Sequence, residues 1–270
     1  MRDDRHIAGV KPYRVVIVTL DAHAAGPAAR ITPRLARDFP GLEVSVHAAA
    51  EWAESPAALE RARAAVNGAD MVVANLLFLE EHVQALLPEL TAARARADAF
   101  VGVIADPAIV KLTRMGDLDM GKPASGAMAL LKKLRGSRAP SAQSGEKQMA
   151  MLRRLPKILR FIPGKAQDLR AWFLAMQYWL GGSDDNIEQM IRFLIGRYST
   201  RPGWKGAKSL PPVDYPDVGL YHPDLPNRIG TDAARLPRPI GATRTGGILM
   251  LRSGVLAGDT APYDADSRAF

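Results

Sequence analysis

The chain of 270 residues lacks cysteine, and it also lacks any apolar run long enough to cross a membrane. Without cysteine it can form no disulfide framework, no thiolate nucleophile and no cysteine-type zinc site. A membrane-spanning helix needs about 20 apolar residues, and the first twelve residues have no apolar stretch like that of a secretory signal. The composition, 47% hydrophobic and 24% charged, is that of an ordinary globular protein. We therefore expect a cytoplasmic protein without a transmembrane segment.

The excess positive charge of the chain lies in one segment. Residues 111–170 hold 14 Lys and Arg against four Asp and Glu, whereas the rest of the chain holds 22 against 24. A basic stretch can bind nucleic acid, an anionic membrane surface or an acidic partner. Its cations Lys132, Lys133, Arg135 and Arg138 alternate with no aromatic residues and match no nucleic-acid motif. We expect a solvated basic face or a surface for a partner or carboxylate ligand, and no nucleic-acid binding.

The first 110 residues alternate between β-runs and helical patterns. Strands are expected at Arg14–Leu20, Leu42–His47, Asp70–Leu77 and Phe100–Ala105, and helices up to Phe39, at Pro56–Asn67 and at Glu80–Ala97. Ser55 as N-cap with Pro56 at the first helical position marks the start of the second helix. Such alternation predicts parallel pairing through right-handed crossovers. The fold class is therefore α/β, a doubly wound parallel sheet of the flavodoxin or Rossmann kind.

Changes in composition divide the chain into five expected parts. They are an amino-terminal α/β domain (1–135) that ends in a helix at Ala124–Leu134, a mobile linker (136–145), a helical hairpin (146–198), an irregular connector (199–245), and the truncated start of a second α/β domain (246–270). The first strand of that second unit is expected at Gly247–Leu251.

The helical hairpin is the most distinctive stretch. Each helix carries one apolar stripe at helical spacing: Leu169, Trp172, Phe173, Met176 and Leu180 in the first, and Ile187, Met190, Ile191, Leu194, Ile195 and Tyr198 in the second. Gly181 and Gly182 suit the left-handed end of the first helix. Asp185 followed by Glu188 suits a capping box for the second.

This hairpin closely resembles that of the large porphyrin-binding subunit of magnesium chelatase, called the H subunit, a family related to the cobaltochelatase large subunit. Further blocks fit the same family: TLDAHAAGPAAR from Thr19, KPASGAMALLKKLRG from Lys122, GLYHPDLP from Gly219 and GVLAGDTAPYD from Gly254. The resemblance runs from about Tyr13 to Asp264. The large subunit of this family is several times longer, so the chain resembles its amino-terminal portion.

The resemblance implies a part in inserting Mg²⁺ into protoporphyrin IX during chlorophyll or bacteriochlorophyll biosynthesis. Mg²⁺ and protoporphyrin IX would be substrates, and this chain would bind no cofactor of its own. The implied partners are an ATPase motor subunit, which uses the ATP, and an adaptor subunit. Two alternatives stay open: a non-catalytic scaffold or interaction module of that complex, and a cobaltochelatase-like subunit. We expect this short chain alone, fragment or genuine product, to be inactive.

Five residues are candidates for porphyrin or partner contact. Asp21 and His23 follow the first expected strand, where doubly wound folds bind ligands, although they could equally cap the next helix. His222, beside Tyr221 on a Pro-containing loop, could approach a porphyrin, or simply hydrogen-bond in a turn. Trp179 lies off the main stripe and could stack on a macrocycle, although core packing is the commoner role. The sequence assigns no catalytic or metal-binding residue.

Residues 116–122 have the G-x-x-x-x-G-K skeleton of a phosphate-binding loop. Pro123 stands where a Ser or Thr hydroxyl should bind magnesium, and Asp117 and Asp119 would place negative charge in an anion site. The chain also contains no G-x-G-x-x-G. We therefore expect no nucleotide binding by this chain.

Overall fold

The β-branched runs of the amino-terminal region form one six-stranded sheet. Its strands are β1 (Tyr13–Thr19), β2 (Leu42–Ala48), β3 (Met71–Asn75), β4 (Ala99–Val103), β5 (Arg114–Met115) and β6 (Leu118–Asp119), in the order β2-β1-β3-β4-β5-β6. The first four pair in parallel, and β5 and β6 continue the sheet in antiparallel fashion. The predicted doubly wound α/β fold is thereby confirmed.

The coordinates are a computed structural model that describes residues 11–20, 22–122, 155–164, 166–225, 228–237, 246–261 and 263–265. Three predictions fall outside these residues: the helix at Ala124–Leu134, the linker at 136–145, and the contribution of Asp21. Most of the cations of the basic segment also lie outside them. These stay predictions.

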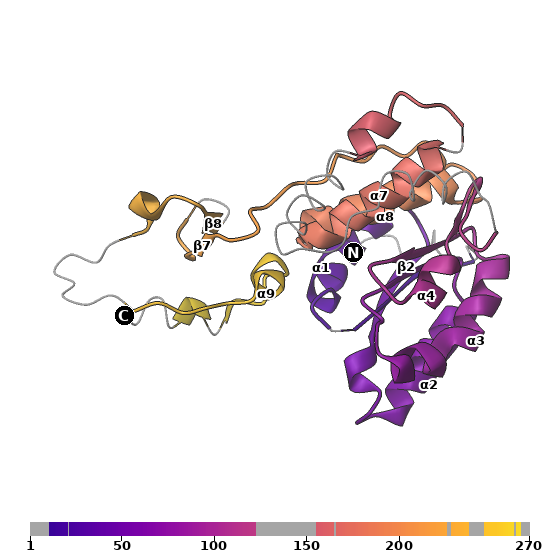
Figure 1. The fold of residues 1–270 in the computed structure, drawn as a ribbon, viewed down its shortest axis with the longest axis horizontal. Helices are drawn as coiled ribbons and strands as arrows, with labels where there is room; N and C mark the ends of the chain where they lie inside the picture. Colours follow the sequence, from indigo (N-terminus) through magenta and orange to yellow (C-terminus); the bar gives the residue numbers. More distant parts are fainter. Residues whose placement is uncertain are drawn as a thin grey trace, which may run out of the picture.

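Helices cover both faces of the sheet, as the doubly wound pattern requires (Figure 1). They are α1 (Ala25–Asp38), α2 (Pro56–Asn67), α3 (Glu80–Arg96) and the short α4 (Pro107–Lys111), with a 3-10 turn η2 (Ala49–Glu51) after β2. The odd-numbered side chains of β1 pack against α1, and the even-numbered ones pack in the core that α2 and α3 share. The Ser55 hydroxyl accepts a hydrogen bond from the Ala58 amide, so the predicted cap of α2 is confirmed.

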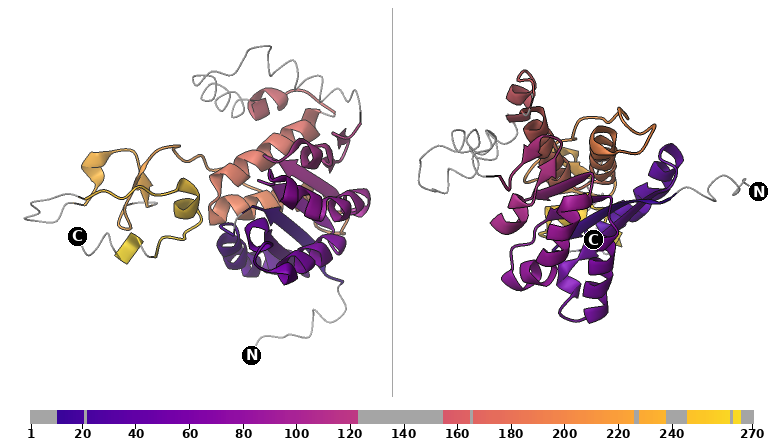
Figure 2. Two further views of the ribbon diagram at one scale, coloured as in Figure 1. Left: turned by 60° about the horizontal axis from the view of Figure 1, so that its bottom comes forward. Right: turned by 90° about the vertical axis from the view of Figure 1, so that its right-hand side faces the viewer.

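The helical hairpin covers the remainder of the α1 face. It consists of α7 (Ala166–Gly181) and α8 (Asp184–Tyr198), and its apolar stripes join the same core as β1, β3 and β4. Trp172 packs into this core and donates its indole N–H to the Gly102 carbonyl of β4 at 2.8 Å. Figure 2 shows the hairpin lying against the sheet and α1. Burial of two stripes on one face explains why the hairpin does not project into solvent.

The turn between α7 and α8 corrects one prediction. Gly182 has φ +57, the left-handed conformation expected there. The N-cap of α8, however, is Ser183, whose hydroxyl accepts from the Asn186 amide at 3.3 Å. The predicted capping box of Asp185 and Glu188 is therefore wrong, because the Glu188 carboxylate pairs with two arginines instead.

The edge of the sheet contains a hairpin that the sequence did not predict. α4 ends at Lys111, and β5 and β6 then form a hairpin whose turn is Gly116–Asp117. Gly116 has φ +54, as the first turn residue of a two-residue hairpin requires. Strands of two residues are too short to produce a periodic pattern.

The Asp168 carboxylate of α7 holds this turn by a hydrogen bond. It accepts hydrogen bonds from the Asp117 amide at 2.9 Å, from Arg197 at 2.9 Å and from the Tyr198 hydroxyl at 2.8 Å. Burial and the Asp168 charge raise the pKa of Tyr198. The residues that resemble a phosphate-binding loop thus form a hairpin held by the protein's own carboxylate.

The irregular segment after α8 lies across other elements. Trp204 packs edge-on against Tyr13 and Phe39, with ring centroids 5.1 and 5.3 Å away. Asn186 of α8 exchanges two hydrogen bonds of 2.9 Å with the backbone of Val213. These contacts tie residues 199–213 to α1, α8 and the start of β1.

The described residues after 214 form a carboxyl-terminal arm that extends away from the sheet (Figure 1). It contains the paired strands β7 (Leu220–Tyr221) and β8 (Ile229–Gly230), the 3-10 turn η3 (Ala233–Arg235) and α9 (Arg252–Leu256). The strand predicted at Gly247–Leu251 is absent: this run pairs with no described strand, and its large apolar side chains are mostly exposed. An unpaired apolar run is not stable as a strand in water. The second α/β unit itself stays a prediction.

Within the described part of the chain, no helix has the length and apolar character needed to cross a bilayer.

We predict that Gly116→Ala destabilises the protein far more than Gly203→Ala. Both glycines have positive φ, but a Cβ at position 116 would lie 2.6 Å from the Asp168 carboxylate, whereas none of the described atoms lies within 4 Å of one at 203. The expected losses in unfolding free energy are about 2–4 kcal/mol for Gly116→Ala and about 1–2 kcal/mol for the control. Urea unfolding would measure both. Equal losses would show that the turn can move away from Asp168 without cost.

Candidate functional site

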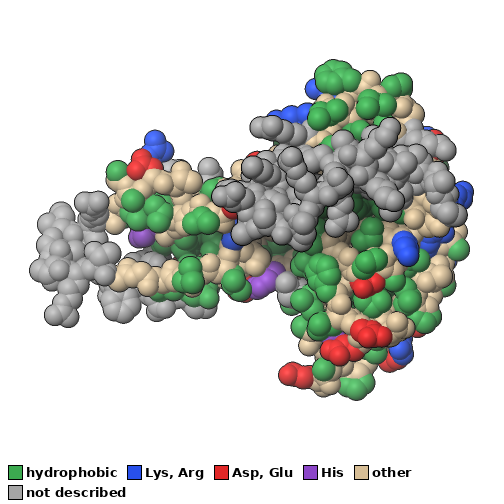
Figure 3. All heavy atoms as spheres, in the orientation of Figure 1, with side chains coloured by type: hydrophobic (Ala, Val, Ile, Leu, Met, Phe, Trp, Pro, Cys, Tyr) green, Lys and Arg blue, Asp and Glu red, His purple; other side chains and the backbone are tan. Residues whose placement is uncertain are grey.

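The candidate site is the junction where the arm meets α1 and the start of α8. A hollow of about 390 Å³ lies there, lined by Arg30, Ser183, Asp184, Asp185, Tyr215, Arg228, Ile229, Val255, Leu256 and Gly258. In the view of Figure 1, α9 lies beside α1. Figure 3 shows the arm meeting the main body there, with apolar side chains along the arm. The lining combines two cations and two carboxylates with an apolar wall.

Arg30 of α1 holds the junction from the side of the sheet. Its Nε and Nη2 atoms each lie 2.7 Å from one Asp184 carboxylate oxygen, and Nη2 also donates to the Ala257 carbonyl at 2.6 Å. The hydrogen bonds that Arg30 donates to Asp184 raise the pKa of Arg30. One guanidinium thus joins α1, α8 and the end of α9, which a lysine could not do with the same geometry.

Arg252, the first residue of α9, makes a second clamp. Its guanidinium donates to the carbonyls of Pro216 at 2.8 Å, Leu180 at 3.0 Å and Tyr215 at 3.2 Å. Leu180 belongs to the last turn of α7, whose carbonyls have no partner within the helix. Arg252 therefore caps α7 and fixes α9 to the hairpin.

A third arginine organises the inside of the arm. Arg228 donates to the Asp264 carboxylate at 2.6 Å and to the Thr260 hydroxyl at 3.0 Å, and it lies over the Tyr221 ring at 5.8 Å. The Tyr221 hydroxyl donates to the same carboxylate. That hydrogen bond lowers the pKa of Asp264, while burial raises the pKa of Tyr221. The cluster joins β7 to the end of the described chain.

The structure places three of the predicted residues around this junction. His23 follows β1 and is half-buried, and a Cβ built at Gly254 of α9 would lie 3.9 Å from its Cε1 atom. Trp179 is half-buried in the last turn of α7, next to the carbonyl that Arg252 caps, and it packs against the main core. Tyr221 belongs to the Arg228 cluster. Their roles in porphyrin or partner contact stay predictions.

His222 lies in the turn between β7 and β8. Its Nδ1 atom accepts a hydrogen bond from the Asp224 amide at 3.2 Å, and its own amide donates to the Arg228 carbonyl at 3.1 Å. The structural role that the sequence allowed for His222 is therefore observed. Its approach to a porphyrin is untested.

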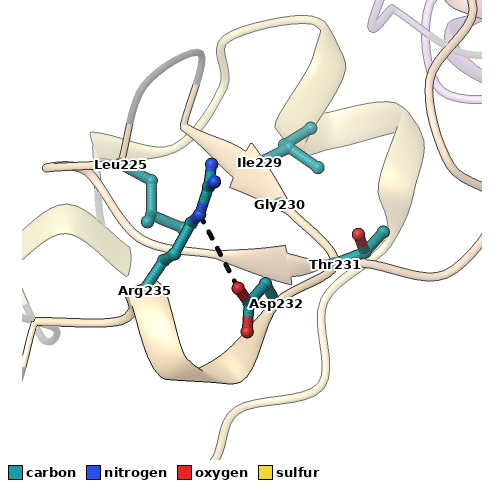
Figure 4. Close-up of a pocket in the computed structure, with 6 residues that line it drawn as sticks. All are labelled: Leu225, Ile229, Gly230, Thr231, Asp232 and Arg235. Carbon is teal, nitrogen blue, oxygen red and sulfur yellow. Dashed lines mark ion pairs between the residues drawn. The ribbon is translucent and has the colours of Figure 1, made fainter.

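A second hollow of about 360 Å³ lies on the arm itself. Figure 4 shows its lining residues Leu225, Ile229, Gly230, Thr231, Asp232 and Arg235, which come from β8, η3 and their connections. The one ion pair among them joins Arg235 and Asp232 at 3.6 Å, and both side chains are largely exposed. Such an exposed ion pair contributes little energy, so it does not indicate a particular ligand for this hollow.

The chemistry of the junction suits polar contact better than proton transfer or metal binding. Arg30 and Arg228 are each paired with a carboxylate. Across the described ranges, no three His, Asp or Glu side chains come together in a way that could hold a metal ion. The sequence did not predict the three arginine clamps, because a guanidinium that caps distant carbonyls leaves no spacing signal in one sequence.

Two family models match successive parts of the chain. A domain of unknown function, DUF3479, matches residues 14–173, and the family described as CobN/Magnesium Chelatase matches residues 176–270. The boundary between the two matches falls inside α7.

Curated relatives carry the name of the magnesium-chelatase H subunit. The protein of Cereibacter sphaeroides is 67% identical over 263 residues, which are 97% of this chain and 22% of that protein. The protein of Rhodobacter capsulatus is 68% identical over 253 residues, 94% of this chain and 21% of its own. The chloroplastic magnesium-chelatase protein ChlH of rice (Oryza sativa) is 31% identical over 164 residues, 58% of this chain and 11% of its own. The chain thus spans about a fifth of the two bacterial relatives.

We predict that Arg252→Ala releases the arm without unfolding the sheet. The substitution leaves three carbonyls without their donor, so local opening of α9 should become at least tenfold more frequent. Limited proteolysis and hydrogen exchange of residues 246–261 would detect it, while the unfolding midpoint of the sheet stays unchanged. Arg235→Ala is the matched control, because its only described partner is one exposed carboxylate. Equal protease resistance of both variants would contradict the clamp.

Proposed function

Because the chain belongs to the family of the magnesium-chelatase H subunit, we propose that it forms part of the porphyrin-binding subunit of an ATP-dependent magnesium chelatase. That enzyme would insert Mg²⁺ into protoporphyrin IX in bacteriochlorophyll or chlorophyll biosynthesis. The observation that carries the proposal is 67% identity over 97% of this chain to a protein of that name. The ATPase motor subunit and the adaptor subunit would be its partners.

The reaction makes three demands on the protein. Mg²⁺ must lose tightly held water, two pyrrole protons must pass to a base, and a flat ring with two carboxylates must be held in place. The hollows at the junction and on the arm lie at the small end of the range of about 300–1,000 Å³ found for ligand pockets. We therefore infer that this region contributes contacts and scaffold, and that the metal is inserted on other parts of the full-length subunit.

The sheet edge supports the use of ATP by a partner subunit. Gly116 and Asp117, at the start of the phosphate-loop-like motif, form a hairpin turn whose outer amide is bonded to Asp168. A negative carboxylate in that place would repel a nucleotide phosphate.

A second candidate function, a non-catalytic interaction module, is favoured by one exposed apolar surface. Ile158, Phe161 and Ile162 are 57%, 83% and 43% exposed, close to one another in the chain. The Gln167 amide holds this turn by donating to the Leu159 carbonyl at 2.9 Å and to neighbouring carbonyls. Exposed apolar side chains that lie close together are typical of surfaces that bind other proteins. A cobaltochelatase-like role is supported only by the shared description of the model that matches residues 176–270.

We predict saturable, micromolar or tighter binding of a soluble protoporphyrin analogue to the purified chain. Trp179→Phe should weaken that binding about tenfold if the indole stacks on the ring. Trp52→Phe is the matched control, because Trp52 packs in the core on the opposite face of the sheet. Porphyrin absorbance and tryptophan quenching would measure both. No binding by a folded chain would favour the interaction module.

We also predict that this chain cannot replace the full-length large subunit. Mixed with motor subunit, adaptor subunit, porphyrin, Mg²⁺ and ATP, it should form no Mg-protoporphyrin. It should instead co-sediment with at least one partner subunit. Phe161→Ser should abolish that association in the interaction model, while the similarly exposed Val218→Ser should not. Metalloporphyrin formation would contradict the scaffold-only role.

A further inference from the structure

The strand order places a topological switch point between β1 and β3. From β1 the chain moves outward to β2, and it then crosses back to β3 on the other side of β1. The connecting helix α1 lies on one face, and α2 and α3 lie on the other. In doubly wound sheets, ligands bind outside the carboxyl ends of the strands at such a point.

The carboxyl ends of the two strands carry buried polar side chains. Thr19 ends β1 and Asn75 ends β3, and both are 0% exposed. Because Val18 pairs with Ala74, Thr19 and Asn75 are next to each other in the parallel register. Strand side chains alternate between faces, so both point to the face of Ile17 and Val73, which is the face that α1 covers.

Neither side chain is satisfied by the protein. Within the described part of the chain, the Thr19 hydroxyl and both polar atoms of the Asn75 amide are buried without a hydrogen-bond partner. Nearly all buried polar groups in native proteins are paired, because an unpaired one costs stability. Three orphaned atoms side by side therefore mark a place where something else supplies the hydrogen bonds. The backbone at the same edge is also strained, since Leu76 and Ile104 have φ +53 and +48.

The amino terminus of α1 lies at this end of the sheet. The helix of 14 residues starts six positions after β1 ends, has no side-chain cap and has no acidic residue in its first turn. Its partial positive charge is therefore not neutralised from within the first turn, and such ends attract anions. The Thr19 hydroxyl and the Asn75 amide can both donate to an anion.

We propose that Thr19 and Asn75 form the floor of a binding site for the oxyanion of a small ligand, a carboxylate or a phosphate, beside the amino terminus of α1. Both side chains are 0% exposed, so a ligand reaches them only when the structure around them opens. Two sources fit the same chemistry: a free phosphate, and a carboxylate of a porphyrin. A site of this kind would exist whatever reaction the full-length subunit catalyses.

Shape-matched substitutions test the site directly. In Thr19→Val and Asn75→Leu, binding of inorganic phosphate or of a soluble porphyrin dicarboxylate should weaken about tenfold or more, as for lost hydrogen bonds to a charged group. The melting temperature without ligand should stay the same or rise in Thr19→Val, because the substitution removes an unpaired buried hydroxyl. Calorimetric titration and thermal unfolding of the full chain would measure these effects.

Thr113→Val is the matched control. Thr113 is also 0% exposed, but its hydroxyl exchanges hydrogen bonds of 3.0 and 3.2 Å with the Gly102 backbone. This variant should lose about 2–4 °C of melting temperature and keep its affinity for either probe. Thr19→Val is expected to show the reverse: an unchanged or higher melting temperature and a weaker affinity for the probe.

The two probes distinguish the two possible sources of the oxyanion. They also distinguish failure of this site from failure of the proposed porphyrin function. Phosphate binding alone supports a free anion, and binding of the porphyrin dicarboxylate but not of its dimethyl ester supports a porphyrin carboxylate. The proposal is overturned if neither probe binds the wild-type chain, or if Thr19→Val and Asn75→Leu leave both affinities unchanged. Binding of the dimethyl ester that is indifferent to these substitutions would overturn the oxyanion site and leave the proposed porphyrin function intact.

Discussion

The buried carboxylate of Asp168 fixes how the helical hairpin sits on the sheet. A buried carboxylate is tolerated only when its oxygens are fully hydrogen-bonded, and the partners of Asp168 come from two separate parts of the fold. Asp117 lies in the edge hairpin of the sheet, and Arg197 and Tyr198 end α8. Because α7 supplies the carboxylate itself, one group sets the relative positions of the sheet edge and both helices. The indole of Trp172, bonded to β4, then fixes the middle of α7.

This constraint explains why the boundary between the two family matches is not a boundary in the fold. The matches meet between residues 173 and 176, yet Phe173 and Met176 pack in one core with β1, β3 and β4. The carboxyl-terminal arm is different, because arginine clamps rather than a shared core hold it to the main body. The predicted division at residues 135 and 146 stays untested.

The sequence predicted the elements whose signals are local. Runs of β-branched residues marked the four parallel strands, and Ser55 with Pro56 marked the start of α2. It did not predict features that depend on distant partners. The β5–β6 hairpin is too short for a periodic pattern, and Gly247–Leu251 has the composition of a strand but no neighbour to pair with. The junction shows the same difference. The sequence predicted His23 and Tyr221 because each lies in a recognisable loop. It did not predict Arg30, Arg228 and Arg252, because their partners are far away in the chain. The orphaned side chain of Asn75 became meaningful only when β3 was placed beside β1.

Native-state hydrogen exchange in increasing urea tests the central claim, that the sheet and the helical hairpin are one cooperative unit joined at Asp168. The account predicts that the slowest amides of β1, β3, α7 and α8 merge into a single opening reaction with one free energy and one urea dependence. In Asp168→Asn, that shared free energy should fall for all four elements together. If α7 and α8 exchanged through a separate opening of lower free energy while the strands stayed protected, the hairpin would be an independent unit and the account would be contradicted.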